Sequence, residues 1–391
     1  MKLTKKVNRS LILRELWLLR KTSRVEIAKR LGLDKSTISQ AINELIDKDV
    51  VVEFEEGAAG PRGGRKPTFI SLNTAYGCVL GIEFTYETCI VVAIDMIGSI
   101  VYETNISTEK RDRISLTSLI MNVLESCVGT LHKNGLVVLG IGVGIPGVVH
   151  KEKQTIRYSA PLNIRSQYDF SKEIASRFLI PVVIENDANA CVWGELANHR
   201  QNGPKDFIFL LLQARCGCQK TSSQVGFGIG LSMNGHVHYG HQYSAGEFRS
   251  LFCSESARGQ FSLSDVDLAA IFENPLLGER FLAELCSQVA IIVNTLNLSH
   301  VFFGGTFEML GSRVKEIMER EIRKNWPYLY DDDLEESIHF SSFGYQAVAY
   351  GVASMMLDTL FGDVELLERR DVSKRILTEG NSLNEYVRIV T

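Results

Sequence analysis

The 391-residue sequence lacks a hydrophobic run long enough to cross a membrane. A membrane-spanning helix needs about 18 consecutive apolar residues, and polar or charged side chains interrupt every apolar stretch before that length. No signal-peptide core follows the basic start of the chain, because Arg9 and Arg14 interrupt the apolar residues there. These absences predict a cytoplasmic protein.

The sequence also lacks the dense cysteine pairs of a disulfide framework, which favours reduced thiols. Its eight cysteines lie mostly singly in apolar surroundings, at Cys78, Cys89, Cys127, Cys191, Cys216, Cys218, Cys253 and Cys286. Hydrophobic residues make up 45% of the chain and charged residues 23%, which is ordinary for a globular protein. The length leaves room for two or three domains with a large core.

Charge is shared unevenly along the chain. Residues 1–72 contain 15 basic and 9 acidic residues, and the rest contains 27 basic and 37 acidic residues. The net charge of −4 therefore hides a balance of +6 on the first segment and −10 on the remainder. A basic segment on an acidic body is typical of a module that meets a polyanion such as DNA.

The stretch from Asp34 to Lys48 predicts a helix with one apolar and one polar face. Its apolar stripe, at helical spacing, is Ile38, Ile42, Leu45 and Ile46. The other face carries mostly uncharged hydrogen-bonding side chains, which suit base edges in a major groove better than an ordinary solvated face does. The predicted DNA contacts on this helix are Lys35, Ser36, Thr37, Ser39, Gln40 and Asn43. We expect the Asp34 carboxylate to cap the helix.

The neighbouring segments complete a predicted winged helix-turn-helix over residues 1–72. Ser23 and Glu26 have the spacing of a capping box, and a tight turn leads from that short helix into the polar-faced one. Strand patterns at 50–54 and 68–72 flank a glycine-rich loop, which predicts a wing able to reach phosphates or a narrow minor groove. The basic residues of this wing are Arg62, Arg65 and Lys66. The alternative is a helical hairpin followed by a flexible linker.

The rest of the chain predicts two α/β lobes. A meander of three short strands, a helix, a buried strand and a helix follow one another, and the second half partly repeats this order. We expect a first lobe at residues 73–187 with 346–361 and a second lobe at 188–345. The tail at 362–391 is expected to pack on the body or on a partner subunit.

Several segments of the body resemble the ROK family, which comprises repressors, open reading frames and sugar kinases. They are Gly140–Val149, Glu185–Ala190, Gly226–Gly230, Ser244–Glu247 and Phe303–Gly305. The wing, which ends Gly63-Gly64-Arg65-Lys66-Pro67-Thr68, is similar to that of the family's repressor branch, including its xylose and N-acetylglucosamine repressors. The resemblance covers roughly residues 5–360. It implies a two-lobed actin-like ATPase (ribonuclease H-like) fold and a homodimer or higher homo-oligomer.

The kinases of this family carry a phosphate loop of Asp-x-Gly-Gly-Thr type on the first hairpin. This chain has Glu83-Phe84-Thr85-Tyr86-Glu87-Thr88 instead, without either glycine and with added negative charge. Both changes oppose ATP, so we expect no kinase activity and no cofactor. The glycines at 226–230 can serve either phosphate binding or close backbone packing.

The resemblance implies a monosaccharide site at Gly147, Asn163, Asn186, Asp187 and Glu247. In the family's kinases the aspartate is the general base, whereas here we expect it to accept sugar hydroxyls without any transfer. An alternative role for Asp187 is to cap the helix that follows it.

The zinc loop usual in the family is missing. Arg249 and Ser250 stand in place of its Gly-His, and residues 251–259 contain one cysteine. A makeshift site of Cys216, Cys218, Cys253 and one of His236, His238 or His241 would lack the usual ligand spacing, so we expect no metal.

Taken together, these features predict a sugar-responsive repressor of carbohydrate-utilisation genes. It would bind a double-stranded DNA operator through the N-terminal module and a monosaccharide such as glucose or xylose between the lobes. One alternative is an ATP-dependent sugar kinase that carries a DNA-binding module. Another is a constitutive DNA-binding protein whose body only dimerises.

Overall fold

The computed structural model of the protein describes residues 2–55, 68–85, 88–108, 116–169, 171–178, 180–214, 225–254, 259–327, 334–367 and 370. Several residues singled out above lie outside these ranges, namely Arg62, Arg65, Lys66, Tyr86, Glu87, Cys216 and Cys218. Among the described helices, none is both long and apolar enough to cross a membrane.

The N-terminal module packs helices against a small sheet of order β1-β3-β2. Its elements are α1 (Lys2–Leu19), β1 (Lys21–Thr22), α2 (Arg24–Leu31), α3 (Lys35–Asp47), β2 (Val51–Glu55) and β3 (Thr68–Leu72). The apolar stripe of α3 is buried as predicted: Ile38, Ile42 and Leu45 have no exposed surface, and Ile46 is half-buried. The stripe therefore forms the core against α1 and α2, and the polar side of α3 faces outward.

The caps of the two short helices differ from each other. The Ser23 side chain accepts a hydrogen bond from the Glu26 amide at 3.2 Å, as the capping box predicts. Asp34 occupies the N-cap of α3, but its carboxylate makes no capping hydrogen bond, so that prediction was wrong. The helix begins instead with the Ile38 amide donating to the Asp34 carbonyl at 3.1 Å. The exposed carboxylate is left to water, which competes for its hydrogen bonds.

The first lobe is built on a five-stranded sheet of order β10-β7-β4-β5-β6. Its elements are β4 (Cys78–Phe84), β5 (Thr88–Asp95), β6 (Ile100–Ser107), α4 (Leu116–Lys133), β7 (Val138–Ile145), the hairpin β8 (Val148–His150) and β9 (Thr155–Tyr158), α5 (Ser171–Phe178) and β10 (Val182–Asn186). Strands β4, β5 and β6 form the predicted antiparallel meander, and β7 and β10 add in parallel.

The second lobe repeats this topology. Its elements are β11 (Phe207–Ala214), β12 (Val225–Met233), β13 (His236–Val237), η1 (His241–Tyr243), α7 (Asp265–Ala269), α8 (Pro275–Leu296), β14 (His300–Gly305), η2 (Thr306–Leu310), α9 (Arg313–Lys324), η3 (Leu334–Ser337), β15 (Ile338–Phe340) and η4 (Gly344–Gln346). Strands β11, β12 and β13 are antiparallel, and β14 and β15 run parallel to β11. The predicted internal repeat is therefore confirmed.

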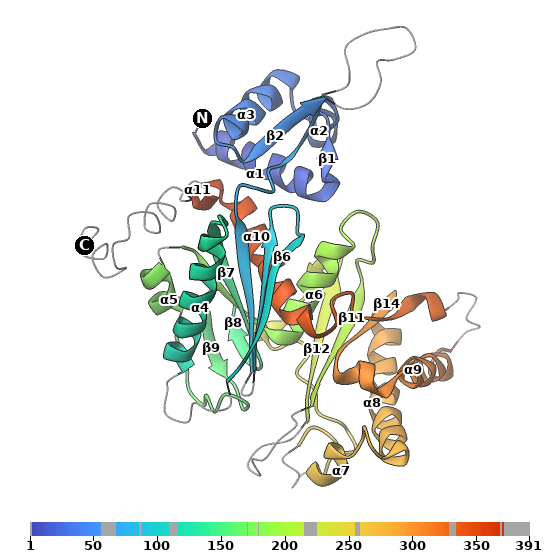
Figure 1. Ribbon diagram of the computed structural model, residues 1–391. Helices are drawn as coiled ribbons and strands as arrows, with labels where there is room; N and C mark the ends of the chain where they lie inside the picture. The colour runs from blue at the N-terminus through green and yellow to red at the C-terminus, as the bar shows by residue number, and fades with distance from the viewer. Residues whose placement is uncertain are drawn as a thin grey trace.

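Helices α6 (Asp187–Asn198) and α10 (Ala347–Gly362) pack against each other between the two sheets (Figure 1). Their approach is close because glycines carry the contact. A Cβ at Gly351 of α10 would lie 1.7 Å from the Ala190 carbonyl oxygen of α6. Strand β12 also packs closely on α6, because a Cβ at Gly230 would lie 2.4 Å from the Ala188 carbonyl oxygen. Close packing thus accounts for part of the glycine-rich strand at 226–230.

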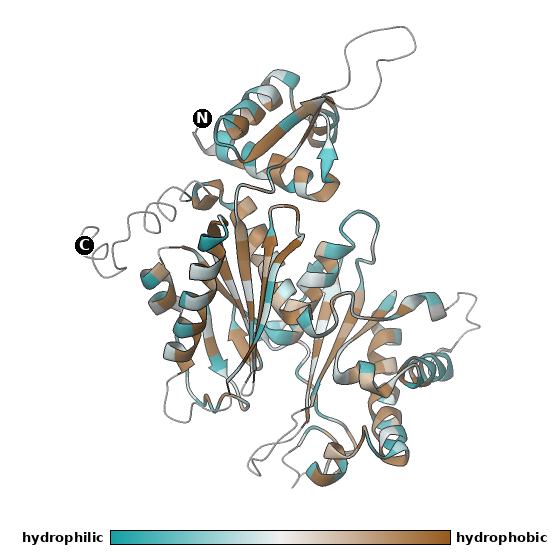
Figure 2. Ribbon diagram, in the orientation of Figure 1, coloured by the Kyte–Doolittle hydropathy of each residue, from teal (hydrophilic) through white to brown (hydrophobic). Residues whose placement is uncertain are grey.

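The module rests on the C-terminal end of α10. Buried residues of α1 belong to the same apolar core as Leu360 and Phe361 of α10. Helix α11 (Val364–Leu367) joins this core through Val364 and Leu367, so the start of the tail packs on the body. Figure 2 shows hydrophobic residues along the strands of both sheets, mixed colours on helices such as α4 and α8, and a mostly hydrophilic α9.

Candidate functional site

A cavity of about 530 Å³ lies between the two lobes. The first lobe lines it with the turn after β7, the end of β9 and the start of α6. The second lobe contributes the end of β11, strand β12 and residues 243–249. Because β7, β10 and β11 end here, polar residues that follow these buried strands are brought to one place.

Asn186 caps helix α6 and fixes the first-lobe wall of the cavity. Its side-chain oxygen accepts from the Asn189 amide at 3.0 Å. Its side-chain nitrogen donates to the Gly147 carbonyl and to the Asp187 carboxylate, both at 2.9 Å. The cap is thus Asn186, and the alternative role of Asp187 as the cap is wrong. Gly147 is suited to its place because its φ is +126° and a Cβ there would meet the Tyr158 carbonyl oxygen at 2.3 Å.

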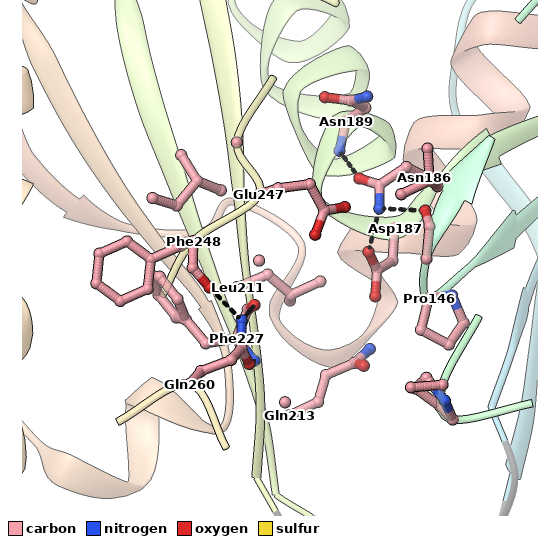
Figure 3. A pocket seen from close by; sticks show the side chains of 18 of the residues that line it. Pro146, Asn186, Asp187, Asn189, Leu211, Gln213, Phe227, Glu247, Phe248 and Gln260 are labelled. Atoms are coloured by element: carbon pink, nitrogen blue, oxygen red, sulfur yellow. Dashed lines mark hydrogen bonds between the residues drawn. The ribbon is translucent and has the colours of Figure 1, made fainter. Parts of the chain in front are cut away.

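Asp187 and Glu247 point toward the same space from opposite sides of the cavity (Figure 3). Asp187 is 7% exposed and accepts a hydrogen bond from the Ala188 amide at 2.9 Å. Burial, together with the charge of Glu247, raises the pKa of Asp187 to about 7. Burial also raises the pKa of Glu247. The pair offers hydroxyl-accepting oxygens to a neutral, polyhydroxylated ligand.

Asn163 is placed away from this group. The structure puts it in a turn with a φ of +54°, where its amide donates to the Ala160 carbonyl at 3.1 Å. Its side chain is exposed, and Ala160 and Pro161 line the cavity in its stead. The turn conformation, which asparagine tolerates well, explains the residue without a ligand.

Gln213 and Glu83 form a contact across the lobes that sequence reasoning missed. The Gln213 side chain lines the cavity and donates to the Glu83 carboxyl at 2.7 Å. Glu83 lies at the end of β4, where the resemblance places the phosphate loop, and burial raises its pKa to about 8. The only signal was a polar residue that ends the apolar strand Leu210-Leu211-Leu212.

Within the described part of the chain, no group of three or more histidine, cysteine, aspartate or glutamate side chains has the geometry to hold a metal ion. Cys253 donates to the carbonyls of Gly259 and Phe261, each at 3.4 Å. Cys216 and Cys218 lie outside the described residues.

The predicted DNA-reading residues of α3 divide by exposure. Lys35, Ser36, Gln40 and Asn43 are exposed, and Thr37 and Ser39 are half-buried. An additional residue, Arg24, contacts this surface from the start of α2. Its guanidinium donates to Asn43 Oδ1 at 2.8 Å and pairs with Glu53 at 3.2 Å. The contact joins residues that are distant in sequence, so no local pattern indicated it.

The far end of α6 meets the module. The Arg200 guanidinium, just beyond the helix, lies 4.1 Å from the ring centroid of Trp17 on α1. It also donates to the carbonyls of Ala197 at 2.7 Å and Ile97 at 3.0 Å. Trp17 also packs against Phe361 of α10, at 5.7 Å between ring centroids. One helix thus links the cavity to the DNA-binding module.

Comparisons with known proteins agree with this arrangement. Residues 79–249 match the ROK family, and residues 8–52 match a winged helix-turn-helix DNA-binding family. The chain carries a ROK family domain behind a winged helix-turn-helix. It is 27% identical over 266 residues to the xylose repressor of Bacillus spizizenii (strain W23), a match that covers 66% of this chain and 65% of that protein. The chain therefore spans less than two thirds of the length of this curated relative.

Solved ROK structures share the fold. The crystal structure of a ROK family transcriptional regulator, a homolog of the E. coli MLC protein, superposes with a TM-score of 0.71 at 18% identity, covering 93% of this chain and 98% of that one. A ROK family glucokinase from Streptomyces griseus in complex with glucose and AMPPNP gives 0.55 at 17% identity, covering 71% and 99%. The predicted winged module and actin-like, two-lobed body are thus confirmed.

Proposed function

We propose that the protein is a sugar-responsive transcriptional repressor of carbohydrate-utilisation genes, acting in the cytoplasm without a cofactor. The observation that carries the proposal is that helix α6 runs from the cavity to the DNA-binding module. Asn186 and Asp187 face the cavity at its start, and Arg200 contacts the DNA-binding module at its end. A ligand in the cavity and the module's position are thereby linked through one packed element. The proposed lobes are residues 73–187 with 346–361 and residues 188–345.

The proposed effector is a monosaccharide such as glucose or xylose. The cavity volume falls within the range of about 300–1,000 Å³ that is usual for small-molecule sites. Ionised Asp187 and Glu247 would accept hydroxyl hydrogens, and the carbonyl of Gly147 is already held in place by Asn186. The similarity to a protein named a xylose repressor supports a pentose, and the similarity to a structure with bound glucose supports a hexose.

The proposed response is a change of affinity for the operator. A dimer of winged modules must present its recognition helices about 34 Å apart to enter successive major grooves, so a modest rotation misplaces one of them. Proposed DNA contacts are the polar residues of α3 together with Arg62, Arg65 and Lys66 of the wing. A coupling free energy of about 1–3 kcal/mol would change operator affinity by roughly 5- to 150-fold.

A sugar kinase with a DNA-binding module is the second candidate, because a glucokinase shares the fold. Against it stands Thr85, which occupies the place of the first glycine in the phosphate loop of the family's kinases. Calorimetric titration with ATP and magnesium separates the two, since the repressor proposal expects no binding. ATP-dependent phosphorylation of a sugar that Asp187→Asn abolishes would favour the kinase.

The proposal is tested in two steps on the full chain. DNA is first selected from a random library by the purified protein, and a reproducible, two-fold symmetric sequence is expected. A panel of monosaccharides is then titrated by calorimetry, and at least one aldose should bind. Selected DNA together with no sugar binding at millimolar concentration would favour the constitutive DNA-binding protein instead.

A further inference from the structure

A short segment of the second lobe carries Glu247 across the cavity, and we call residues 239–247 the strap. Its backbone has left-handed φ values at Gly240, Gln242, Tyr243 and Gly246, between +59° and +86°. Such a conformation is costly for non-glycine residues, which adopt it only where surrounding contacts hold them. The contacts that hold Gln242 and Tyr243 therefore bear on where Glu247 lies.

Those contacts come from the first lobe. The hairpin β8–β9 reaches across to η1, and the Arg157 guanidinium donates to the Gln242 carbonyl at 2.9 Å. The ring of His150 lies 4.7 Å from that of Tyr243, centroid to centroid. Both strained non-glycine residues of the strap thus have a partner on this one hairpin.

The start of the strap is fixed to the same lobe by a separate set of contacts. The Tyr239 hydroxyl donates to the buried Glu185 carboxylate at 2.7 Å. The Lys151 ammonium lies 3.9 Å from the centroid of the Tyr239 ring. Glu185 in turn accepts from the amide of Asn186 at 2.9 Å, so this anchor adjoins the first-lobe wall of the cavity.

The end of the strap lies flat on its own lobe. A Cβ at Gly246 would come within 1.9 Å of the Ile229 carbonyl oxygen, so that residue is pressed against β12. The next residue is Glu247, which faces Asp187. The strap is therefore held to the first lobe at Tyr239 and at Gln242, and to β12 of its own lobe at Gly246 beside the cavity.

We propose that the β8–β9 hairpin is a clasp that holds the strap, so that Arg157 and His150 position Glu247 for the sugar without themselves lining the cavity. The inference rests on the proposed sugar site and adds what sets its geometry. The clasp also holds the two lobes together beside the cavity. A ligand therefore contacts both Asp187 and Glu247 only when the hairpin is bound to the strap. Arg157 and His150 are accordingly positioning residues.

The first test needs no sugar. Amide hydrogen exchange of residues 239–247 is compared between the wild-type chain and the double variant His150→Ala/Arg157→Ala. The clasp predicts exchange at least fivefold faster in the variant, confined to the strap. The matched control is Lys153→Ala/Arg165→Ala, which removes two exposed cationic side chains of the first lobe and leaves Arg157 and His150 in place. Unchanged exchange in the first variant would overturn the clasp.

The second test measures D-xylose and D-glucose affinity by calorimetry on the same proteins. The clasp predicts a Kd about tenfold weaker in the double variant and unchanged in the control. Arg157→Lys alone should restore most of the affinity lost in Arg157→Ala, because a lysine can still donate to the Gln242 carbonyl. Equal affinities for wild type and double variant would contradict the positioning role. If wild type binds neither sugar, the proposed function fails, and the exchange result alone decides the clasp.

Discussion

The two ends of helix α6 are built in opposite ways. At its start, Asn186 and Asp187 present polar atoms to a cavity, and the Asp187 carboxylate has a raised pKa because it is buried there. At its end, Arg200 is enclosed between the Trp17 ring and backbone carbonyls of its own lobe and the neighbouring one. The first end can gain hydrogen bonds from a ligand. At the second end, the two terminal nitrogens of the Arg200 guanidinium already donate to protein carbonyls, and its buried Nε has no partner among the described residues.

This difference suits the two ends to different tasks. A helix of this length spans about 18 Å. Its middle packs so closely against α10 that a Cβ at Gly351 would overlap the Ala190 carbonyl oxygen. Packed interiors move between discrete arrangements rather than deforming smoothly. A shift forced at the cavity would therefore reach Arg200 and the module. A shift at one end should therefore be felt at the other, and a change in the wing should affect DNA binding alone.

The largest effect is expected from Asp187→Asn, which keeps the shape of the site but removes the charge. Hydrogen bonds to charged groups are the strong ones, and losing two of them should weaken monosaccharide binding about 100-fold. Affinity for selected DNA in the absence of sugar should stay unchanged, because the module end is untouched. Calorimetry and DNA-binding anisotropy measure the two quantities. The control is Asn198→Ala, an exposed position at the opposite end of the helix.

A smaller effect is expected from pH. With its pKa raised to about 7, Asp187 is mostly protonated at pH 6 and mostly ionised at pH 8. If the ionised form binds sugar, affinity should rise roughly tenfold over this interval. Because the folded pKa lies above the ordinary value of 3.8, the free energy of unfolding should fall as pH rises from about 4 to 7. Asp187→Asn should lessen both dependences, and sugar affinity independent of pH would argue against Asp187 as a ligand.

Arg200→Ala alters the other end. We expect sugar affinity to stay within twofold of wild type, while the sugar-dependent change in DNA affinity shrinks about fivefold, in the range of a lost cation–π contact. The measurement is DNA binding with and without saturating sugar. Lys205→Ala, an exposed cation in the same connection between α6 and β11, is the control. Full retention of the sugar response would break the proposed link through α6.

The smallest effect is expected from Arg65→Ala, in the predicted wing. Removing one phosphate contact should weaken DNA binding about threefold and lower the slope against salt concentration by about one. The loss should be the same with and without sugar. An unchanged salt slope would count against the wing as a DNA contact.

The sequence predicted the parts of the structure that depend on local patterns. The apolar stripe of α3 specified which face is buried, because helical spacing leaves one solution. The antiparallel meander and its repeat followed from short apolar strand patterns joined by short turns. Asn186, Asp187 and Glu247 were predicted from a resemblance, and the structure places all three on one cavity.

The sequence did not predict contacts between residues far apart along the chain. The hydrogen bond from Gln213 to Glu83, the contact of Arg24 with Asn43 and the clasp of Arg157 on Gln242 each join segments brought together only by folding. Asp34 shows that a local pattern can also fail. A favourable residue type at an N-cap does not decide whether its side chain turns toward the helix. At an exposed position such as Asp34, water competes with the helix amides for the carboxylate.

The most direct test of the account is the affinity of the wild-type chain and Asp187→Asn for selected DNA, titrated with D-xylose and D-glucose. The account predicts that one of these sugars changes wild-type affinity at least fivefold, and that Asp187→Asn binds the same DNA equally well but does not respond. An equal response in both proteins, or no response of wild type to either sugar at millimolar concentration, would contradict it.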